Sequence, residues 1–445
     1  MKKSNRKGFT IVELVIVIAV IAILAAVLIP TFTNLIKKAN ESSDVQAVRQ
    51  MNTFLTTDGA VTPTTPGRLF AVLSEGGFNA ENYTPLVKDR YFFWDRELNI
   101  ILYMDKDGTV LFPKNATPSG SLYNLSGSTT LIGQTATIAL PAAPEANDAV
   151  TETKFTVANG ADFVEVAEFV KQYQTTYKAS AAGETLVIEL TANIDLQGAD
   201  INFTDTETTG MNVIFKSNDP NQIRTITGLY ISDKHATVGK SSDGVQSNDY
   251  GHSLFYYVKN LTVENIHIDY SVIGGYEASQ AGFFAGQVQG NATFTNVFVT
   301  NSDVQGNRKV GVLCGYTHGT LSFTNVNIDN CTVSTAWGEA GVVVGVMDVG
   351  GVDGDVVINK DITVTNSSVT VASVEGYTKK TATAGETSYV VVKKDGGKAR
   401  IATANFAFLA IDGSGNPKVQ TSEGEISAYT ALDTLDAFKN AQGTK

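Results

Sequence analysis

Three short stretches that end in glycine decide the fold of the second half of the chain: AGFFAG at residues 281–286, VGVLCG at residues 310–315 and AGVVVG at residues 340–345. They begin 29 and 30 residues apart. A repeat of this length, with only short alternating apolar runs, cannot bury its own apolar face, so neighbouring repeats bury it by stacking. The spacing therefore predicts a stack of similar rungs around one continuous core.

A second stretch recurs at nearly the same spacing, as NIHI at residues 265–268, NVFV at residues 296–299 and NVNI at residues 325–328. Residues 253–258 look like an earlier copy of the first stretch, and residues 361–364 look like a later copy of the second. The glycines permit sharp corners and close backbone approach. The asparagine of each repeat is expected to bond its own copy above and below as an internal ladder. A parallel β-solenoid follows from this pattern.

Both stretches resemble the GLUG motif of bacterial surface proteins and, more generally, right-handed parallel β-helices. The similarity covers about residues 155–375, where residues 186–196 and 225–231 look like the first rungs. It implies a β-helix repeat domain at residues 154–375. Before these rungs, residues 162–177 have an amphipathic pattern that predicts a helix capping the open end of the stack. A twisted β-sandwich is the alternative fold.

Residues 376–445, beyond the repeats, are expected to form a C-terminal hairpin and cap region that closes the far end of the stack. The stretch Lys394-Asp395-Gly396-Gly397 is a hairpin signal. The elements predicted around it are strands at residues 389–392, 400–403 and 406–411 and a short helix at residues 432–441. On the other side of the repeats, residues 116–153 are rich in Thr, Ser, Ala and Pro, which predicts a linker with some strand content.

The segment before the linker, residues 58–115, predicts a small globular part with an antiparallel sheet. Its expected elements are a helix at residues 67–76 and three short strands at residues 91–94, 99–103 and 109–112. Asp105-Lys106-Asp107-Gly108 lies between the last two strands. Its Asp-x-Asp-Gly core is also how a calcium loop begins, but the full twelve-residue spacing with a closing Glu is missing. A hairpin turn is therefore favoured.

The N-terminal segment is a basic leader followed by an apolar run. The run is uninterrupted for sixteen residues, from Leu14 to Ile29, and Glu13 is the acid that precedes it. At about 1.5 Å per residue, residues 9–29 make about 31 Å of helix, enough to cross a bilayer. Positive charge before such a run stays on the cytoplasmic side. An amphipathic pattern then continues the helix to residue 57.

The string KGFTIVEL at residues 7–14 resembles the class III signal of type IV prepilins. The resemblance implies a leader at residues 1–8, cleavage between Gly8 and Phe9 by a prepilin peptidase, and N-methylation of Phe9. It also gives Glu13 a partner, the cationic amine of a mature N-terminus. Pro30 matches a proline that kinks or locally melts pilin helices. A plain signal anchor, a cleaved secretory signal and a soluble core helix are the alternatives, and none of them explains Gly8-Phe9 together with Glu13.

Composition limits the kind of partner. The chain has 33 Lys and Arg against 45 Asp and Glu, a net charge of −12, which argues against nucleic acid. Its two cysteines, Cys314 and Cys331, are too few for a disulfide scaffold. An exported chain can pair them, but two buried small residues are favoured. No sequence pattern predicts a metal or cofactor.

An enzyme is not expected. The acids of the repeats fall singly in turns (Glu264, Asp269, Asp303, Asp329, Asp353 and Asp355), where Asp is ordinarily structural. The four histidines (His235, His252, His267 and His318) show no metal-ligand spacing. Four aromatic residues in or near rung loops could stack on sugars if they are exposed, and otherwise pack on neighbouring rungs (Tyr270, Tyr276, Tyr316 and Trp337).

Together these features predict an α+β pilin-like part, with a long helix at residues 9–57 and a small sheet, followed by a mainly-β solenoid. The expected function is a non-enzymatic subunit of a type IV pilus or a type II secretion-like pseudopilus that displays the β-helix for adhesion. Its expected partners are the membrane, the peptidase, other pilin subunits, an assembly platform with its ATPase, and surface glycans or proteins. The chain would wait in the cytoplasmic membrane and then enter a surface fibre. A membrane-anchored adhesin that never polymerises is the first alternative, and a polysaccharide-active β-helix enzyme is the second.

Overall fold

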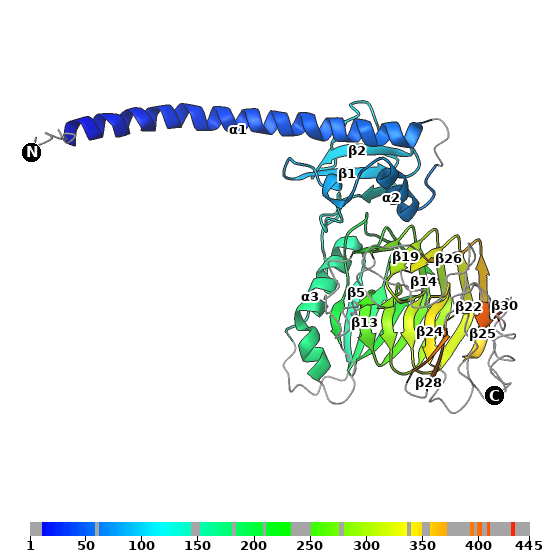
Figure 1. The fold of residues 1–445 in the computed structure, drawn as a ribbon. Coiled ribbons are helices and arrows are strands. Elements are labelled where there is room, and N and C mark those ends of the chain that lie inside the picture. Colours follow the sequence, from blue (N-terminus) through cyan, green and yellow to red (C-terminus); the bar gives the residue numbers. More distant parts are fainter. Residues whose placement is uncertain are drawn as a thin grey trace, which may run out of the picture.

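The computed structural model describes residues 11–57, 62–143, 152–179, 184–207, 211–232, 251–275, 280–335, 340–348, 357–371, 392–395, 398–402, 407–409 and 429–431. These residues form a long helix, a small head that packs on the second half of that helix, and a large β domain (Figure 1). We call residues 62–124 the head and residues 152–371 the solenoid.

The first part is helix α1, Ile11–Thr56, whose 46 residues run without a break. The apolar run and the amphipathic stretch after it are therefore one rod, and its N-terminal half extends well beyond the head (Figure 1). α1 continues through Pro30, so the local melting that the resemblance implied at this proline does not occur. Next to Pro30, the hydroxyls of Thr31 and Thr33 donate to the carbonyl oxygens four residues earlier.

The head contains the predicted small antiparallel sheet. Its strands lie in the order β3-β2-β1-β4, with the bounds β1 Arg90–Asp95, β2 Ile100–Asp105, β3 Val110–Phe112 and β4 Leu122–Asn124. Helix α2, Pro66–Glu75, and the 3-10 helix η1, Ala80–Tyr83, precede the sheet. α2 begins where it does because the side chain of Thr65 accepts the N–H of Arg68 and a proline occupies the first turn. β4 comes from the stretch expected to be a linker.

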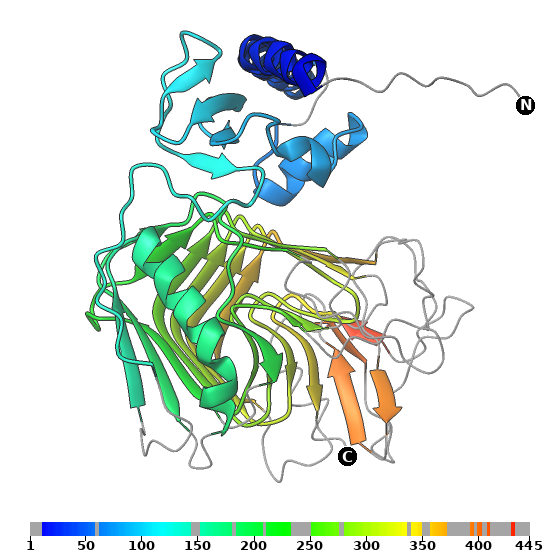
Figure 2. The same ribbon diagram turned by 90° about the vertical axis from the view of Figure 1, so that its left-hand side faces the viewer.

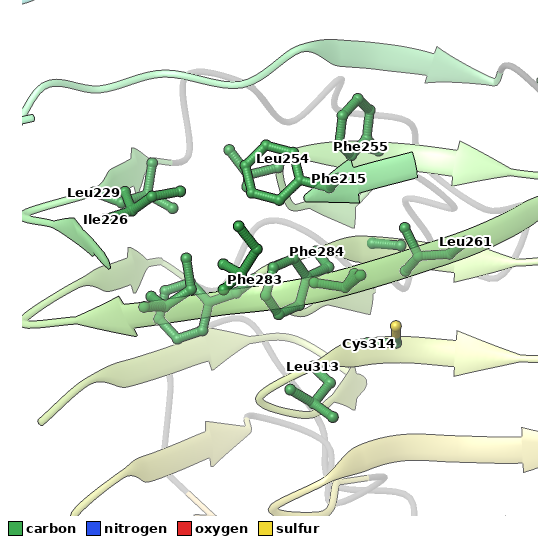
Figure 3. Close-up of a cluster of buried hydrophobic side chains, with 14 of the residues drawn as sticks. Phe215, Ile226, Leu229, Leu254, Phe255, Leu261, Phe283, Phe284, Leu313 and Cys314 are labelled. Atoms are coloured by element: carbon green, nitrogen blue, oxygen red, sulfur yellow. The ribbon is translucent and has the colours of Figure 1, made fainter. Parts of the chain in front are cut away.

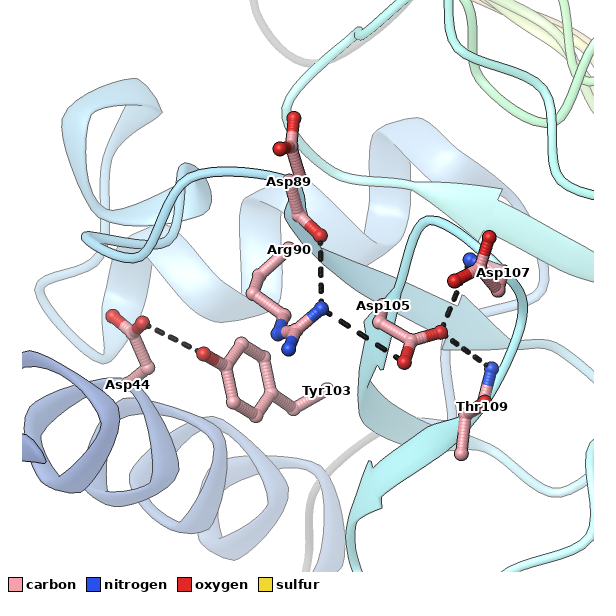
Figure 4. A network of polar contacts seen from close by, with 7 residues as sticks. All are labelled: Asp44, Asp89, Arg90, Tyr103, Asp105, Asp107 and Thr109. Carbon is pink, nitrogen blue, oxygen red and sulfur yellow. Dashed lines mark hydrogen bonds and ion pairs between the residues drawn. The ribbon is translucent and has the colours of Figure 1, made fainter. Parts of the chain in front are cut away.

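The turn between β2 and β3 confirms the hairpin predicted at residues 105–108. One carboxylate oxygen of Asp105 accepts the backbone N–H groups of Asp107 and Thr109, at 3.0 and 2.8 Å (Figure 4). Gly108 has a φ of 85°, which suits glycine at the end of this turn. The carboxylate thus closes a turn and is not arranged to hold calcium.

Three stacks of parallel strands form the walls of the solenoid (Figures 1 and 2). The first wall contains β5 Glu152–Val157, β6 Thr185–Leu190, β9 Asn212–Ser217, β14 Asn260–Asp269, β18 Ala292–Thr300, β22 Leu321–Asp329 and β25 Val357–Thr365, with β7 Ile194–Asp195 and β10 Arg224–Thr227. The second contains β11 Tyr230–Ser232, β15 Val272–Gly274, β19 Asp303–Gly306, β23 Thr332–Thr335 and β26 Ser368–Val371. The third contains β8 Thr204–Glu207, β13 Phe255–Val258, β17 Ala285–Val288, β21 Cys314–Thr317 and β24 Val344–Asp348. A small sheet joins β12 Gly251–His252, β16 Gln280–Ala281 and β20 Lys309–Val310.

The strand register confirms that the sequence repeats are rungs. Equivalent positions of the second recurring stretch lie one above the next in the first wall: Ile266, Val297, Val326 and Ile362. Equivalent positions of the first stretch do the same in the third wall: Phe255, Ala285, Cys314 and Val344. The stacking is parallel, so the predicted solenoid is confirmed and the sandwich alternative is wrong.

Apolar side chains from the walls fill the interior, as Figure 3 shows for one part of the core. Aromatic rings stack from rung to rung, with Phe203 on Phe255 at 4.8 Å and Phe294 on Phe323 at 5.8 Å between ring centroids. Helix α3, Gly160–Ala179, lies across the first rung (Figure 2). Its Phe163 is buried against Phe203, so α3 covers the core at this end, where the sequence predicted a cap.

The predicted asparagine ladder exists, but it is not internal. The side-chain amide of Asn296 donates to Asn265, and that of Asn325 donates to Asn296, both at 2.8 Å. All three residues have a φ between 51° and 58° at a bend of the first wall, and their exposure rises from buried Asn265 to exposed Asn325. The glycines of the other stretch do allow close approach, because a Cβ on Gly311 would lie 2.4 Å from the backbone nitrogen of Gly345.

The C-terminal strands are β27 Val392–Asp395, β28 Lys398–Ala402, β29 Ala407–Leu409 and β30 Tyr429–Ala431. β27 and β28 form the predicted hairpin, shifted by a few residues from the expected strands, and β28 pairs antiparallel with β24 of the third wall. The short helix predicted at residues 432–441 lies outside the described residues. Cys314 and Cys331 are both free and buried, and burial raises the pKa of each thiol.

Candidate assembly interface

Most of the exposed large apolar side chains in the described part of the chain lie on the N-terminal half of α1. Of the residues singled out in the sequence, Glu13 lies in the first turn of α1, whereas Gly8 and Phe9 lie outside the described residues. Among the described residues, α1 is the helix long and apolar enough to cross a membrane, and none of its apolar window is buried. This helix half needs a lipid or protein environment.

Exposure extends to every side of this half. The four consecutive residues from Val15 to Ile18 point to different sides of the helix, because successive residues are about 100° apart, and each is between 47% and 57% exposed. An amphipathic surface helix would instead bury one stripe and expose the other. The apolar side chains of the free half of α1 are therefore not packed in a core within the described part of the fold.

The other half of α1 is fixed to the head. Val48, Met51 and Leu55, at intervals of three and four residues, are buried against the sheet. Asn52 adds a reciprocal pair of hydrogen bonds with the backbone of Ile101, in which its amide donates at 2.9 Å and its carbonyl oxygen accepts at 2.6 Å. These contacts fix the rotation and register of α1, so the head presents the free half in one orientation.

Asp44 is the polar counterpart of this apolar packing (Figure 4). Its buried carboxylate accepts the backbone N–H groups of Leu86 and Val87 at 2.8 and 3.2 Å and the hydroxyl of Tyr103 at 3.0 Å. Burial, and then the nearby Asp44 charge, raise the pKa of the Tyr103 phenol well above its ordinary value. Sequence patterning gave no reason to expect Asp44 to be buried, because its partners lie 42 to 59 residues away.

A second set of contacts fixes the head on the solenoid. The N–H of Gly67, in the first turn of α2, donates to the buried carboxylate of Asp303 at 3.1 Å, and a Cβ on Gly67 would lie only 2.5 Å from that carboxylate. The guanidinium of Arg96 lies 3.7 Å from the ring centre of Tyr270. Burial raises the pKa of Asp303, and hydrogen bonds from Thr65 and Gly67 offset part of that rise.

Asp195 lies at the same junction. Its carboxylate accepts the N–H of Gln197 at 3.0 Å. Burial raises the pKa of Asp195 to about 6, while that hydrogen bond and the charge of Arg96 act in the opposite direction. The head–solenoid junction thus contains one buried carboxylate, Asp303, and one half-buried carboxylate, Asp195, neither of which the sequence connected with the head.

The acids of the rungs form a structural column at the end of the first wall. Asp269 accepts the hydroxyl of Thr300 at 2.6 Å, and Asp329 accepts the hydroxyl of Thr365 at 2.6 Å. Carboxylate and hydroxyl alternate from rung to rung, which keeps like charges apart. No group of three or more His, Cys, Asp or Glu in the described residues could hold a metal ion. Asp353 and Asp355 lie outside those residues.

The four aromatic candidates do not form a sugar platform where the structure describes them. Tyr316 is buried, and the centre of its ring lies 4.1 Å from the amine of Lys309. The guanidinium of Arg96 covers the ring of Tyr270. Tyr276 and Trp337 lie outside the described residues. Among the histidines, His267 bonds Thr300 within the first wall, and burial lowers its pKa. His252 is buried, His318 contacts Gln287, and His235 lies outside the described residues.

Comparison with known proteins concerns the N-terminal segment. The prokaryotic N-terminal methylation motif matches residues 3–29. The chain is 46% identical over 55 residues to the type IV major fimbrial protein FimA of Dichelobacter nodosus, a match that covers 12% of this chain and 35% of that protein. It is 63% identical over 38 residues to the type IV wide pilus major component PilA4 of Thermus thermophilus, which covers 8% of this chain and 29% of that protein.

The matched segments span about a third of the length of these relatives, and the methylation motif covers the start of α1 and the residues before it. No solved structure matches the chain. The N-terminal segment thus contains the prokaryotic N-terminal methylation motif and is homologous to the N-terminal part of type IV pilins, and in this chain it precedes a β-solenoid.

Proposed function

We propose that this chain is a non-enzymatic structural subunit of a type IV pilus that displays its solenoid on the cell surface for adhesion or another interaction. The observation that carries the proposal is the exposed apolar half of α1, held in one orientation by a head that packs only on the other half. The names of the two relatives, a fimbrial protein and a pilus component, support a pilus over a secretion pseudopilus.

Processing would precede assembly. A prepilin peptidase would cleave between Gly8 and Phe9, and Phe9 would then be N-methylated. The mature helix would wait in the cytoplasmic membrane, with its N-terminus on the cytoplasmic side, until an assembly platform and its ATPase move it into a fibre. Homology of residues 3–29 to the methylation motif supports these steps.

Glu13 is proposed to select the position of each subunit in the fibre. A carboxylate inside hydrocarbon or a packed helix core is unfavourable by a few kcal/mol unless it meets a cation. The amine of Phe9 on a mature chain supplies that cation, and two buried ions are tolerable as a pair and costly apart. A subunit in the wrong register would leave both ions unmatched.

The solenoid is proposed to face outward. The head–solenoid contacts at Gly67–Asp303 and Arg96–Tyr270 hold it on the side of the head away from α1 (Figure 1). A displayed domain of this size favours a minor or tip subunit over a densely packed major one. The regular hydrogen bonding of Asp269 and Asp329 within their column favours a structural role over catalysis for these carboxylates.

Replacing Glu13 tests the assembly step. We expect Glu13→Ala to reduce incorporation of the chain into sheared surface fibres at least tenfold, while the amount in the membrane is unchanged. Glu75→Ala, an exposed acid on α2, is the matched control and should incorporate normally. Equal incorporation of Glu13→Ala and the control would favour the alternative, a membrane-anchored adhesin that never polymerises.

A further inference from the structure

A pocket of about 460 Å³ lies where α1 leaves the head toward its free half. Three segments that are distant in the sequence line it: α1 around Ile36 and Lys37, the chain before β1 at residues 86–90, and Lys106 in the β2–β3 turn. Figure 4 shows part of this corner, with Asp89, Arg90 and the β2–β3 turn close to α1.

The lining of this pocket is basic in an acidic protein. Four of its lining residues are Lys or Arg (Lys37, Lys88, Arg90 and Lys106) and one is an acid, Asp89. The whole chain has the opposite balance, with 33 basic and 45 acidic residues. A local excess of positive charge against this background indicates an anionic ligand.

Two carboxylates beside the pocket, those of Asp44 and Asp105, are already engaged, and the carboxylate of Asp89 is the one acidic group in its lining. Asp44 accepts two backbone N–H groups and the Tyr103 hydroxyl. Asp105 accepts two backbone N–H groups and lies 3.8 Å from the guanidinium of Arg90. In the described part of the chain, Lys37, Lys88 and Lys106 form no ion pair, so their ammonium groups are available to a ligand.

The position along α1 identifies the ligand. The apolar run ends at Ile29, and Lys37 is eight residues further, about 12 Å along the helix. The headgroup layer extends about 5–8 Å beyond the hydrocarbon, within the reach of lysine side chains that extend toward it. Phe32 and Leu35, 57% exposed each, and Leu86, 61% exposed, supply apolar side chains at the same level.

We propose that this pocket binds the phosphate of an anionic phospholipid headgroup while α1 anchors the chain, and that the headgroup seats the head on the membrane surface before assembly. The inference rests on the membrane-anchored precursor of the proposed function. Lys88 and Lys106 would reach the phosphate from the head, and Lys37 from the helix. The contact would orient every waiting subunit in the same way relative to the membrane.

The test measures lipid selectivity of the full chain in phosphatidylcholine vesicles that contain trace spin-labelled phosphatidylglycerol or spin-labelled phosphatidylcholine. The fraction of motionally restricted label gives the preference for the anionic lipid. Three proteins are compared. They are the unaltered chain, a pocket variant with both Lys88→Gln and Lys106→Gln, and a control variant with both Lys114→Gln and Lys259→Gln. The two lysines of the control variant are exposed and do not line the pocket. The four basic residues of the leader are the same in all three.

We expect the pocket variant to lose between about fivefold and twenty-fivefold in preference for phosphatidylglycerol, because each lysine near an anionic surface contributes about fivefold. The control should keep the preference of the unaltered chain. Equal preference in all three proteins overturns the inference while leaving the anchored precursor intact. Failure of the unaltered chain to enter vesicles would instead overturn the precursor, and the inference with it.

Discussion

At the scale of single residues, buried carboxylates fix how the parts of this molecule meet. Asp44 joins α1 to the head through two backbone N–H groups and Tyr103. Asp303 joins α2 to the solenoid through Gly67. A buried carboxylate that accepts several N–H groups is satisfied in one geometry, and moving either partner leaves buried polar groups unmatched. Each acid thus specifies a contact that apolar packing alone would leave free to slide.

Asp195 makes the stability of the molecule depend on pH. Burial raises its pKa from 3.8 to about 6, so the folded state binds this proton more tightly than the unfolded state. Its stabilising contribution is therefore complete below about pH 4 and is lost as the pH rises through about 6. At neutral pH the ionised group lowers the free energy of unfolding by at most about 3 kcal/mol.

The variant Asp195→Asn removes the titratable carboxyl group. We compare the free energy of unfolding of Asp195→Asn with that of the unaltered chain. We expect the variant to gain stability relative to the unaltered chain between pH 4 and pH 7, by up to about 3 kcal/mol. Urea unfolding at fixed ionic strength, followed by circular dichroism at each pH, measures it. Asp303 also has a raised pKa, but it is present in both proteins and cancels in the difference. A difference that is constant with pH would show that burial does not perturb Asp195.

At the scale of elements, the rung bends depend on asparagine for two reasons. Asn296 has a φ of 51°, a conformation that most side chains adopt at a cost, and it also bonds Asn265 and Asn325 on the adjacent rungs. Glycine would accept the conformation without the hydrogen bonds, and alanine would have neither advantage.

The two substitutions at Asn296 therefore separate these contributions. We expect Asn296→Ala to lower the free energy of unfolding of the solenoid by about 2–3 kcal/mol and Asn296→Gly by about 1 kcal/mol less than that. Urea unfolding followed by far-ultraviolet circular dichroism gives both values. If Asn296→Gly lowered the free energy of unfolding as much as Asn296→Ala, the positive φ would not explain the need for asparagine at this bend.

Elements with a local pattern were predictable from the sequence, and contacts between distant elements were not. Alternating apolar residues located β1 to β3, and the repeat spacing located the rungs from β13 to β25. The contact of Gly67 with Asp303 joins residues 236 apart, and no periodicity relates α2 to β19. The side chains of Tyr316 and Tyr270 were candidate sugar platforms, but rung stacking buries one and the head covers the other.

At the scale of the whole molecule, the chain combines a long helix, whose N-terminal half is apolar and exposed, with a solenoid on a common head. The two junctions use different parts of the head: α1 packs on its sheet, and α2 and the loop carrying Arg96 contact the solenoid. Figure 1 shows the resulting layers, with the free half of α1 and the solenoid on different sides of the head. A subunit of this shape can contribute its helix to a fibre core while its solenoid stays outside.

In the proposed assembly, fibre packing and the role of Glu13 both require a mature chain that begins at Phe9. The prediction is that protein purified from the cell surface starts at Phe9 and carries one methyl group on its amine. N-terminal sequencing with mass spectrometry of the N-terminal peptide measures this directly. A surface protein that begins at any other residue, or that retains the leader before Phe9, would contradict the pilin-like account.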